Sequence, residues 1–242
     1  DAYSRELAVQ GRRGIICMSA GNDGDNNISI VKNITSESGD GSFLKTFVHG
    51  NSANVISGIA DLWGTDNTVL NVQWGVYSIS AGTFTPVINI TAAYQSVSTA
   101  GVTDFTSNFN GTITARSYID SNNNRFEVYT EFNSVSQKSS DKVIALNVTG
   151  AKTGQKLYLY SSTLNLTFSN RPTPSSTATI SGFTNGNPQN SINDGACAEN
   201  VIAVGAYVSR TTCGVLTSGS YYPAPSGYTV GSIAPFSSYG TT

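Results

Sequence analysis

Few residues of this 242-residue sequence could perform acid–base or nucleophilic chemistry near neutral pH, and His49 is its only histidine. A serine nucleophile needs a histidine and a carboxylate held in a fixed geometry. No spacing in the sequence ties His49 to such partners; Val48 precedes it and Gly50 follows it. We therefore expect His49 to be a surface or hydrogen-bonded structural residue rather than a catalytic base.

The three cysteines are Cys17, Cys197 and Cys213, and none has the short spacing to another ligand that typifies structural zinc sites. Cys17 lies inside an apolar run, so we expect it to be buried as a small hydrophobic residue. Cys197 and Cys213 would pair only if their loops meet, and the sequence leaves that question open.

The sequence predicts no cofactor and no metal site. Asp23, Asp25 and the neighbouring Asn26 and Asn27 carry the oxygen ligands that suit calcium. They lack the regular spacing of a calcium-binding loop, so calcium at this place is kept only as the alternative.

The composition argues against two classes of function. The 15 acidic and 13 basic residues give a net charge of −2, and no basic run is present, so the electrostatic signature of nucleic-acid binding is missing. No apolar run approaches the roughly 20 residues that a membrane-spanning helix needs. Hydrophobic residues at 38% and aromatic residues at 10% indicate a folded chain with a core.

Both ends of the sequence have the pattern of an α/β fold. Residues 3–8 repeat apolar side chains at helical spacing, and Gly11 stands where a helix would end. The runs 14–18 and 201–205 have no polar face, which is typical of buried parallel strands. A strong turn signal, Asn22-Asp23-Gly24, follows the first of these strands.

The middle of the sequence has the pattern of antiparallel sheets. Apolar and polar residues alternate in short runs, so one face of each strand is expected to lie in a core. About nine strands without helices indicate an antiparallel β-sandwich or jelly roll. Their runs cover residues 43–48, 55–62, 70–76, 87–91, 113–119, 126–132, 144–148, 156–160 and 164–168.

We therefore predict a mainly β fold, in which an antiparallel β-sandwich or jelly-roll insertion at residues 25–195 is flanked by partial α/β segments at residues 1–24 and 196–242. Residues 122–124, three asparagines, are expected to form a hairpin loop, since asparagine tolerates positive φ. Trp63 and Trp74 are expected to fill the sandwich core and its edges, with a sugar-binding platform as the alternative.

Three segments, in this order, resemble the subtilisin-like serine peptidases. Residues 14–24 resemble the strand of that family that ends in Ala-Gly-Asn, and residues 200–206 resemble its next core strand. Residues 233–240 resemble its Phe-Ser-Ser-x-Gly turn. A branch of the family related to the clostridial germination proteases carries a jelly-roll insertion between the first two segments, at the place of residues 25–195.

The resemblance implies roles for four residues. Asn22 matches the asparagine of the family's oxyanion hole, whose amide donates a hydrogen bond to the developing oxyanion. Ser19, Ala20 and Gly21 would line one wall of the pocket for the substrate side chain, a task that suits small residues. Close packing of neighbouring backbone is the alternative reason for their size.

The family's catalytic aspartate, histidine and serine motifs do not occur in this sequence. The missing strings are Asp-Thr/Ser-Gly, His-Gly-Thr-His and Gly-Thr-Ser-Met-Ala. The resemblance therefore implies a fragment of a secreted or cell-envelope serine endopeptidase, inactive by itself. Its partners would be the rest of the peptidase domain and a polypeptide substrate. The alternative is a stand-alone extracellular β-sandwich module that binds carbohydrate or protein.

Overall fold

The computed structural model describes residues 16–50, 55–161, 166–189, 191, 201–214, 221–223 and 226–238. The helix predicted near residue 3 lies outside these residues. The chain divides into two compact units, of which one is Asp1–Asn26 with Pro188–Thr242 and the other is Asn27–Asn187. The fold is mainly β, as predicted, and the only helices of the described residues are the short α2 (Thr103–Thr106) and the 3-10 turn η1 (Gly39–Gly41). None of the described helices is long and apolar enough to cross a bilayer.

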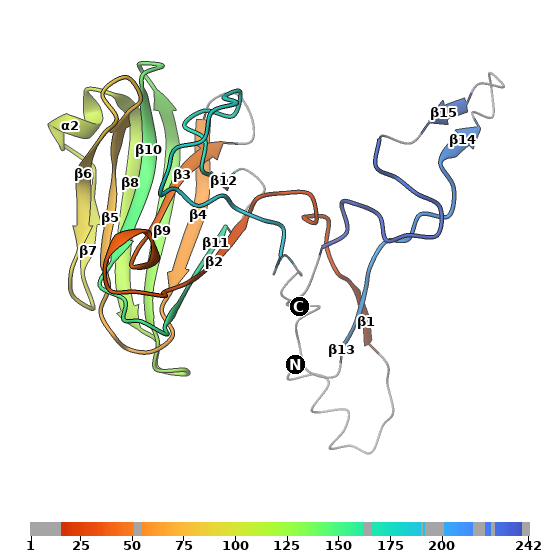
Figure 1. Ribbon diagram of the computed structural model, residues 1–242, viewed down its shortest axis with the longest axis horizontal. Helices are drawn as coiled ribbons and strands as arrows, with labels where there is room; N and C mark the ends of the chain where they lie inside the picture. Colours follow the sequence, from red (N-terminus) through yellow and green to blue (C-terminus); the bar gives the residue numbers. More distant parts are fainter. Residues whose placement is uncertain are drawn as a thin grey trace. The chain divides into compact units, whose positions relative to one another are not determined.

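The first unit contains a parallel pair of strands. β1 (Ile16–Ser19) and β13 (Val201–Val204) lie side by side and run parallel, with each residue of β1 opposite one residue of β13 (Figure 1). This pairing is the one expected of two neighbouring strands in an α/β core. In the same unit, β14 (Thr212–Gly214) and β15 (Tyr221–Pro223) form a short antiparallel pair.

The second unit is a sandwich of two antiparallel sheets, whose strands overlap in the view of Figure 1. One sheet has the strand order β12-β3-β10-β5-β6, and the other has the order β2-β11-β4-β9-β8-β7. All nine predicted strands are present, and β2 and β7 are additional. The strands are β2 (Ser29–Asn33), β3 (Leu44–Gly50), β4 (Val55–Trp63), β5 (Asn71–Ser78), β6 (Thr83–Ile90), β7 (Ser96–Ser98), β8 (Phe109–Ile119), β9 (Phe126–Gln137), β10 (Lys142–Thr149), β11 (Lys156–Ser161) and β12 (Leu166–Ser169).

The core of the second unit lies between its two sheets and follows from the alternation of side chains along each strand. In β9, Phe126, Val128 and Phe132 are buried, whereas Glu127 and Glu131 between them are half-exposed on the outer face. Each buried side chain of this kind contributes roughly 1.5–3 kcal/mol through removal of apolar surface from water. The period of two therefore fixes which face of each strand packs inward.

The hairpin loop between β8 and β9 has the expected conformation. Asp120 Oδ1 accepts hydrogen bonds from the backbone N–H groups of Asn122 at 2.7 Å and Asn123 at 3.1 Å. Asn124 has a φ of 53°, in the left-handed region that asparagine tolerates. The three consecutive asparagines therefore form a turn, as the sequence predicts.

The two tryptophans have different environments. Trp74 lies in the core with 1% exposure, and its Nε1–H donates to Thr130 Oγ1 of the opposite sheet at 3.0 Å. Trp63 is half-buried on the outer face of the six-stranded sheet, and its Nε1–H donates to Asp61 Oδ2 at 2.7 Å. The expected core position is therefore confirmed for Trp74, whereas the side chain of Trp63 lies outside the core, on the outer face of its sheet.

Candidate functional site

The four predicted site residues follow one another at the carboxyl end of β1. Ser19 is the last residue of the strand, and the Ala20 N–H donates to the Val204 carbonyl at 2.9 Å, which continues the parallel pairing. Gly21 has a φ of 110°, which residues with a Cβ rarely adopt, and the chain turns there. Ala20 is buried, whereas Ser19 and Asn22 are exposed.

The main chain on both sides of Asn22 is tied to one distant residue. The Asp23 N–H donates to Ser238 Oγ at 3.0 Å, across 215 residues of sequence. The Ser238 N–H in turn donates to the Gly21 carbonyl at 3.1 Å. These two bonds fix the backbone before and after Asn22, so its Cα has a defined position at the end of β1.

The Asn22 carboxamide is exposed and has no hydrogen-bond partner in the described part of the chain. A neutral amide at a fixed strand end can donate to a developing negative charge without ionising and without reorganising. The local geometry is therefore suited to an oxyanion donor.

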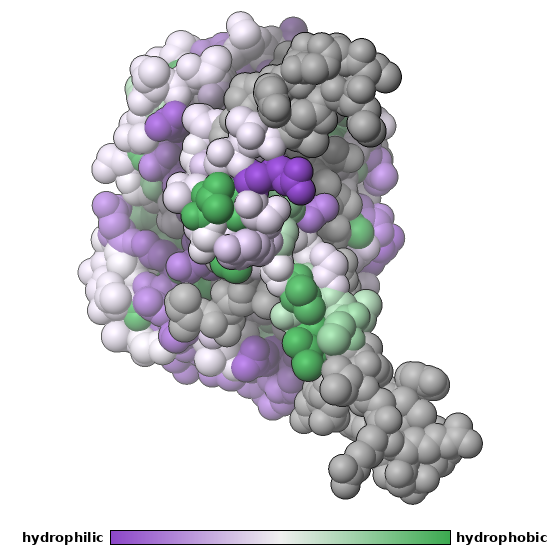
Figure 2. All heavy atoms as spheres, turned by 90° about the vertical axis from the view of Figure 1, so that its right-hand side faces the viewer, coloured by the Kyte–Doolittle hydropathy of each residue, from purple (hydrophilic) through white to green (hydrophobic). Residues whose placement is uncertain are grey.

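Apolar side chains of the parallel pair are exposed. Met18 is 41% exposed, Ile202 53% and Val204 50%, and Cys17 is an exposed free thiol. The expectations that Cys17 and its strand are buried are therefore wrong, because burial of a parallel strand requires layers on both faces that the described residues of this unit do not supply. Figure 2 shows that, on the face it draws, hydrophobic residues reach the surface in small patches surrounded by polar residues.

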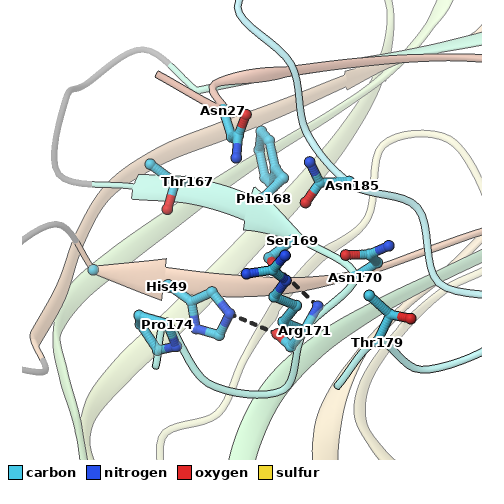
Figure 3. A pocket seen from close by; sticks show the side chains of 11 residues that line it. Asn27, His49, Thr167, Phe168, Ser169, Asn170, Arg171, Pro174, Thr179 and Asn185 are labelled. Atoms are coloured by element: carbon cyan, nitrogen blue, oxygen red, sulfur yellow. Dashed lines mark hydrogen bonds between the residues drawn. The ribbon is translucent and has the colours of Figure 1, made fainter. Parts of the chain in front are cut away.

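His49 lies in the second unit beside a cavity of about 550 Å³, whose lining includes Asn27, Asn170 and Arg171 (Figure 3). The His49 Nε2–H donates to the Arg171 carbonyl at 2.9 Å. Burial lowers the pKa of His49, and the Arg171 hydrogen bond opposes that effect. No carboxylate is among the described residues that line this cavity. His49 is therefore hydrogen-bonded, as expected, and its structural role stays a prediction.

Metal ligands do not cluster in the described residues, where no group of three or more His, Cys, Asp or Glu side chains is placed to hold an ion. Asp23 Oδ1 instead accepts a hydrogen bond from Asn26 Nδ2 at 3.4 Å. Cys197 lies outside the described residues, and Cys213 is described only through its backbone in β14.

A carboxyl pair that the sequence did not reveal lies on the outer face of the six-stranded sheet. Asp61 of β4 and Glu127 of β9 are close enough to hydrogen-bond, and Asp61 Oδ1 is inaccessible to solvent with no N–H donor in the described residues. Burial raises the pKa of Asp61, and the Trp63 hydrogen bond opposes that effect. Burial and the Asp61 charge raise the pKa of Glu127 to about 7. A proton on Glu127 would supply the donor that Asp61 Oδ1 lacks.

This pair predicts a pH dependence of stability. Glu127 binds its proton more tightly in the folded chain than in the unfolded chain, where its pKa is 4.5, so the free energy of unfolding falls as the pH rises from there towards about 7. We expect a loss of roughly 1 kcal/mol between about pH 5 and about pH 8, because solvent screens this half-exposed carboxyl. Urea unfolding of wild type and Glu127→Gln at the two pH values measures it as the difference between the two proteins, because His49, whose pKa is lowered, changes stability in the opposite direction in both.

Glu127→Gln keeps a donor towards Asp61 but does not titrate, so it should remove most of this pH dependence. Glu131→Gln is the matched control, because Glu131 lies on the same strand and pairs with Arg116 at 3.3 Å instead. The same loss in wild type and Glu127→Gln would contradict the assignment to this pair.

Comparison with solved structures gives a likeness in fold, whereas comparison of the sequence gives none. No family model and no curated protein matches the sequence. The fold is similar to that of the CspB protease of Clostridium perfringens, with a TM-score of 0.54 and 14% sequence identity. The similarity covers 94% of this chain and 38% of the protease chain, so this chain spans well under half of that protein. At this identity the likeness shows a shared fold, which is compatible with a part of a protease.

Proposed function

We propose that this chain is the central part of a subtilisin-like serine endopeptidase that acts outside the cell or at the cell envelope. In this proposal residues 1–24 and 196–242 belong to the α/β catalytic core, and residues 25–195 form an inserted β-sandwich domain. The observation that supports the proposal is the parallel pairing of β1 with β13, because Asn22 follows the carboxyl end of β1. Open α/β sheets bind their ligands at that end.

The exposed apolar side chains of β1 and β13 also favour this proposal. A parallel sheet is ordinarily covered by helices on both faces, and two strands alone make at best a marginally stable sheet. The exposed Met18, Ile202 and Val204 are therefore the surface that the rest of a peptidase domain would cover.

The proposed chemistry is acyl transfer on a polypeptide substrate. A serine outside this chain attacks the scissile carbonyl, and negative charge builds on its oxygen as the tetrahedral intermediate forms. The Asn22 Nδ2–H donates to that oxygen, beside a backbone N–H at the serine. Ser19, Ala20 and Gly21 form a wall of the pocket for the substrate side chain, and the histidine and aspartate of the triad also lie outside this chain.

A serine-directed fluorophosphonate tests the proposal. The protein that contains this chain should cleave peptides and should be inactivated by the reagent, and mass spectrometry should place the label on a serine outside residues 1–242. The isolated chain should show neither labelling nor peptide hydrolysis. A label on a serine within the chain, or peptide cleavage that resists the reagent, would overturn the proposal.

A further inference from the structure

The outer face of the five-stranded sheet carries a cavity of about 330 Å³ that lies wholly within described residues. Strands β3, β5, β6 and β10 form its floor, and the segment 180–183 forms its rim. Two backbone hydrogen bonds hold this segment in place: Thr184 N–H donates to the Lys45 carbonyl at 2.7 Å, and Ile180 N–H donates to the Asn170 carbonyl at 2.9 Å. The cavity is therefore formed by fixed elements of the second unit alone.

One side of the cavity is an aromatic wall that includes Tyr77, Phe84 and Phe183. The ring of Phe183 stacks on Phe47 with centroids 4.1 Å apart, and it meets Tyr77 edge-to-face at 5.5 Å. Phe84 lies beside them, with its ring directly over Gly75, where a Cβ would approach it to 2.6 Å. Gly75 therefore leaves the space that this ring occupies, and the wall presents apolar surface to the cavity without side-chain rearrangement.

The other side of the cavity is polar and carries a positive charge. Lys45, Asn147 and Gln73 lie in one row across β3, β10 and β5, and Asn147 Nδ2 donates to Gln73 Oε1 at 2.9 Å. The Lys45 Nζ sits 4.4 Å from the centre of the Phe43 ring. No carboxylate of the described residues forms an ion pair with Lys45, including Asp40, which lies beside Gly182.

We propose that this cavity binds a small organic acid with a flat apolar body. The carboxylate of the ligand pairs with the Lys45 ammonium, and its body packs against Phe84 and Phe183. Ligand cavities combine an apolar lining with a few polar groups that fix orientation. Here the orienting group is the Lys45 ammonium, which lies over the Phe43 ring and forms no ion pair with a carboxylate of the described residues. The volume suits a single ring with a short acidic arm, and Lys45 disfavours cations.

A titration of the whole chain with phenylacetate, followed by ¹⁵N and side-chain NMR shifts, tests this proposal. The matched probe is phenylacetamide, which has the same ring and no charge. We expect phenylacetate to shift the signals of Lys45, Asn147 and Phe84, and to bind about tenfold or more tightly than phenylacetamide, because a charge-assisted hydrogen bond is lost in the neutral probe.

Two substitutions and a control separate the contribution of the Lys45 charge to binding from that of the aromatic wall. Lys45→Met should weaken phenylacetate by about tenfold or more and leave phenylacetamide unchanged, because it keeps the apolar stem and removes the charge. Phe84→Ala should weaken both probes, since it removes part of the wall. Lys152→Met, which replaces an exposed lysine away from the cavity, should change neither.

Equal affinity for the two probes, no shifts at millimolar phenylacetate, or unchanged phenylacetate binding in Lys45→Met would each overturn the proposal. Because the cavity belongs to the second unit, these outcomes are independent of peptidase activity. Failure of the organic-acid site and failure of the proposed protease function are therefore distinguishable.

Discussion

Asn22→Ala, made in the protein that contains this chain, is expected to lower kcat for peptide hydrolysis by about 10²- to 10³-fold, the range that loss of such a donor gives in a subtilisin. In the proposed role, the amide of Asn22 donates to charge that exists only in the transition state, so KM should stay nearly unchanged. The fold should be unaffected, because the carboxamide is exposed and has no partner in the described part of the chain. Steady-state kinetics and circular dichroism provide the two measurements.

Asn26→Ala is the matched control for this prediction. Asn26 lies in the same turn, and its Nδ2 donates to Asp23 Oδ1 at 3.4 Å rather than facing solvent unpaired. Its loss should change kcat less than about threefold, since it removes one weak hydrogen bond away from the strand end. If Asn22→Ala leaves kcat unchanged, Asn22 is not a donor of the oxyanion hole.

The sandwich was largely predictable because its strands are long enough for a period of two to show. β9 alternates over seven residues from Phe126 to Phe132, and that pattern alone identifies both the strand and its buried face. β7, with only Ser96–Ser98, is too short for any period, and β2 has only two buried residues in succession. The sequence does not predict either strand, because their positions in the sheets depend on neighbouring strands rather than on their own pattern.

The contacts between strands were not predictable from the same pattern. Alternation shows that Asp61 and Glu127 face outward, but only the register of β4 against β9 brings their carboxyl groups together. In the same way, the row of Lys45, Asn147 and Gln73 depends on which strands are neighbours. A single sequence indicates which face of the sheet each residue occupies, but it does not show directly which strand lies next to it.

For β1 and β13, the pairing was predictable from the sequence and the burial was not. The apolar runs at both ends of the chain predicted two neighbouring core strands, and β1 and β13 do pair. Their burial was inferred from the absence of a polar face, yet Ile202 and Val204 are about half exposed. Strand pairing needs only the two strands, whereas burial also needs covering layers.

Trp74→Ala is expected to lower the free energy of unfolding of the second unit by about 3–5 kcal/mol, a large share of the total for a domain. Trp74 is 1% exposed, and its ring meets Phe132 edge-to-face at 5.1 Å. Its loss opens a cavity between the two sheets and leaves the Thr130 hydroxyl without its donor. Urea unfolding followed by far-ultraviolet circular dichroism measures the change.

Trp63→Ala provides the comparison, because it deletes the same side chain from the outer face. Trp63 is half-buried, so less apolar surface returns to water, and the main cost is the hydrogen bond to Asp61 Oδ2. A loss of about 1 kcal/mol is expected. Trp74→Phe should fall between the two, since it keeps a ring in the core and loses the indole N–H. Equal losses for Trp63→Ala and Trp74→Ala would mean that the inter-sheet core does not dominate the stability of the sandwich.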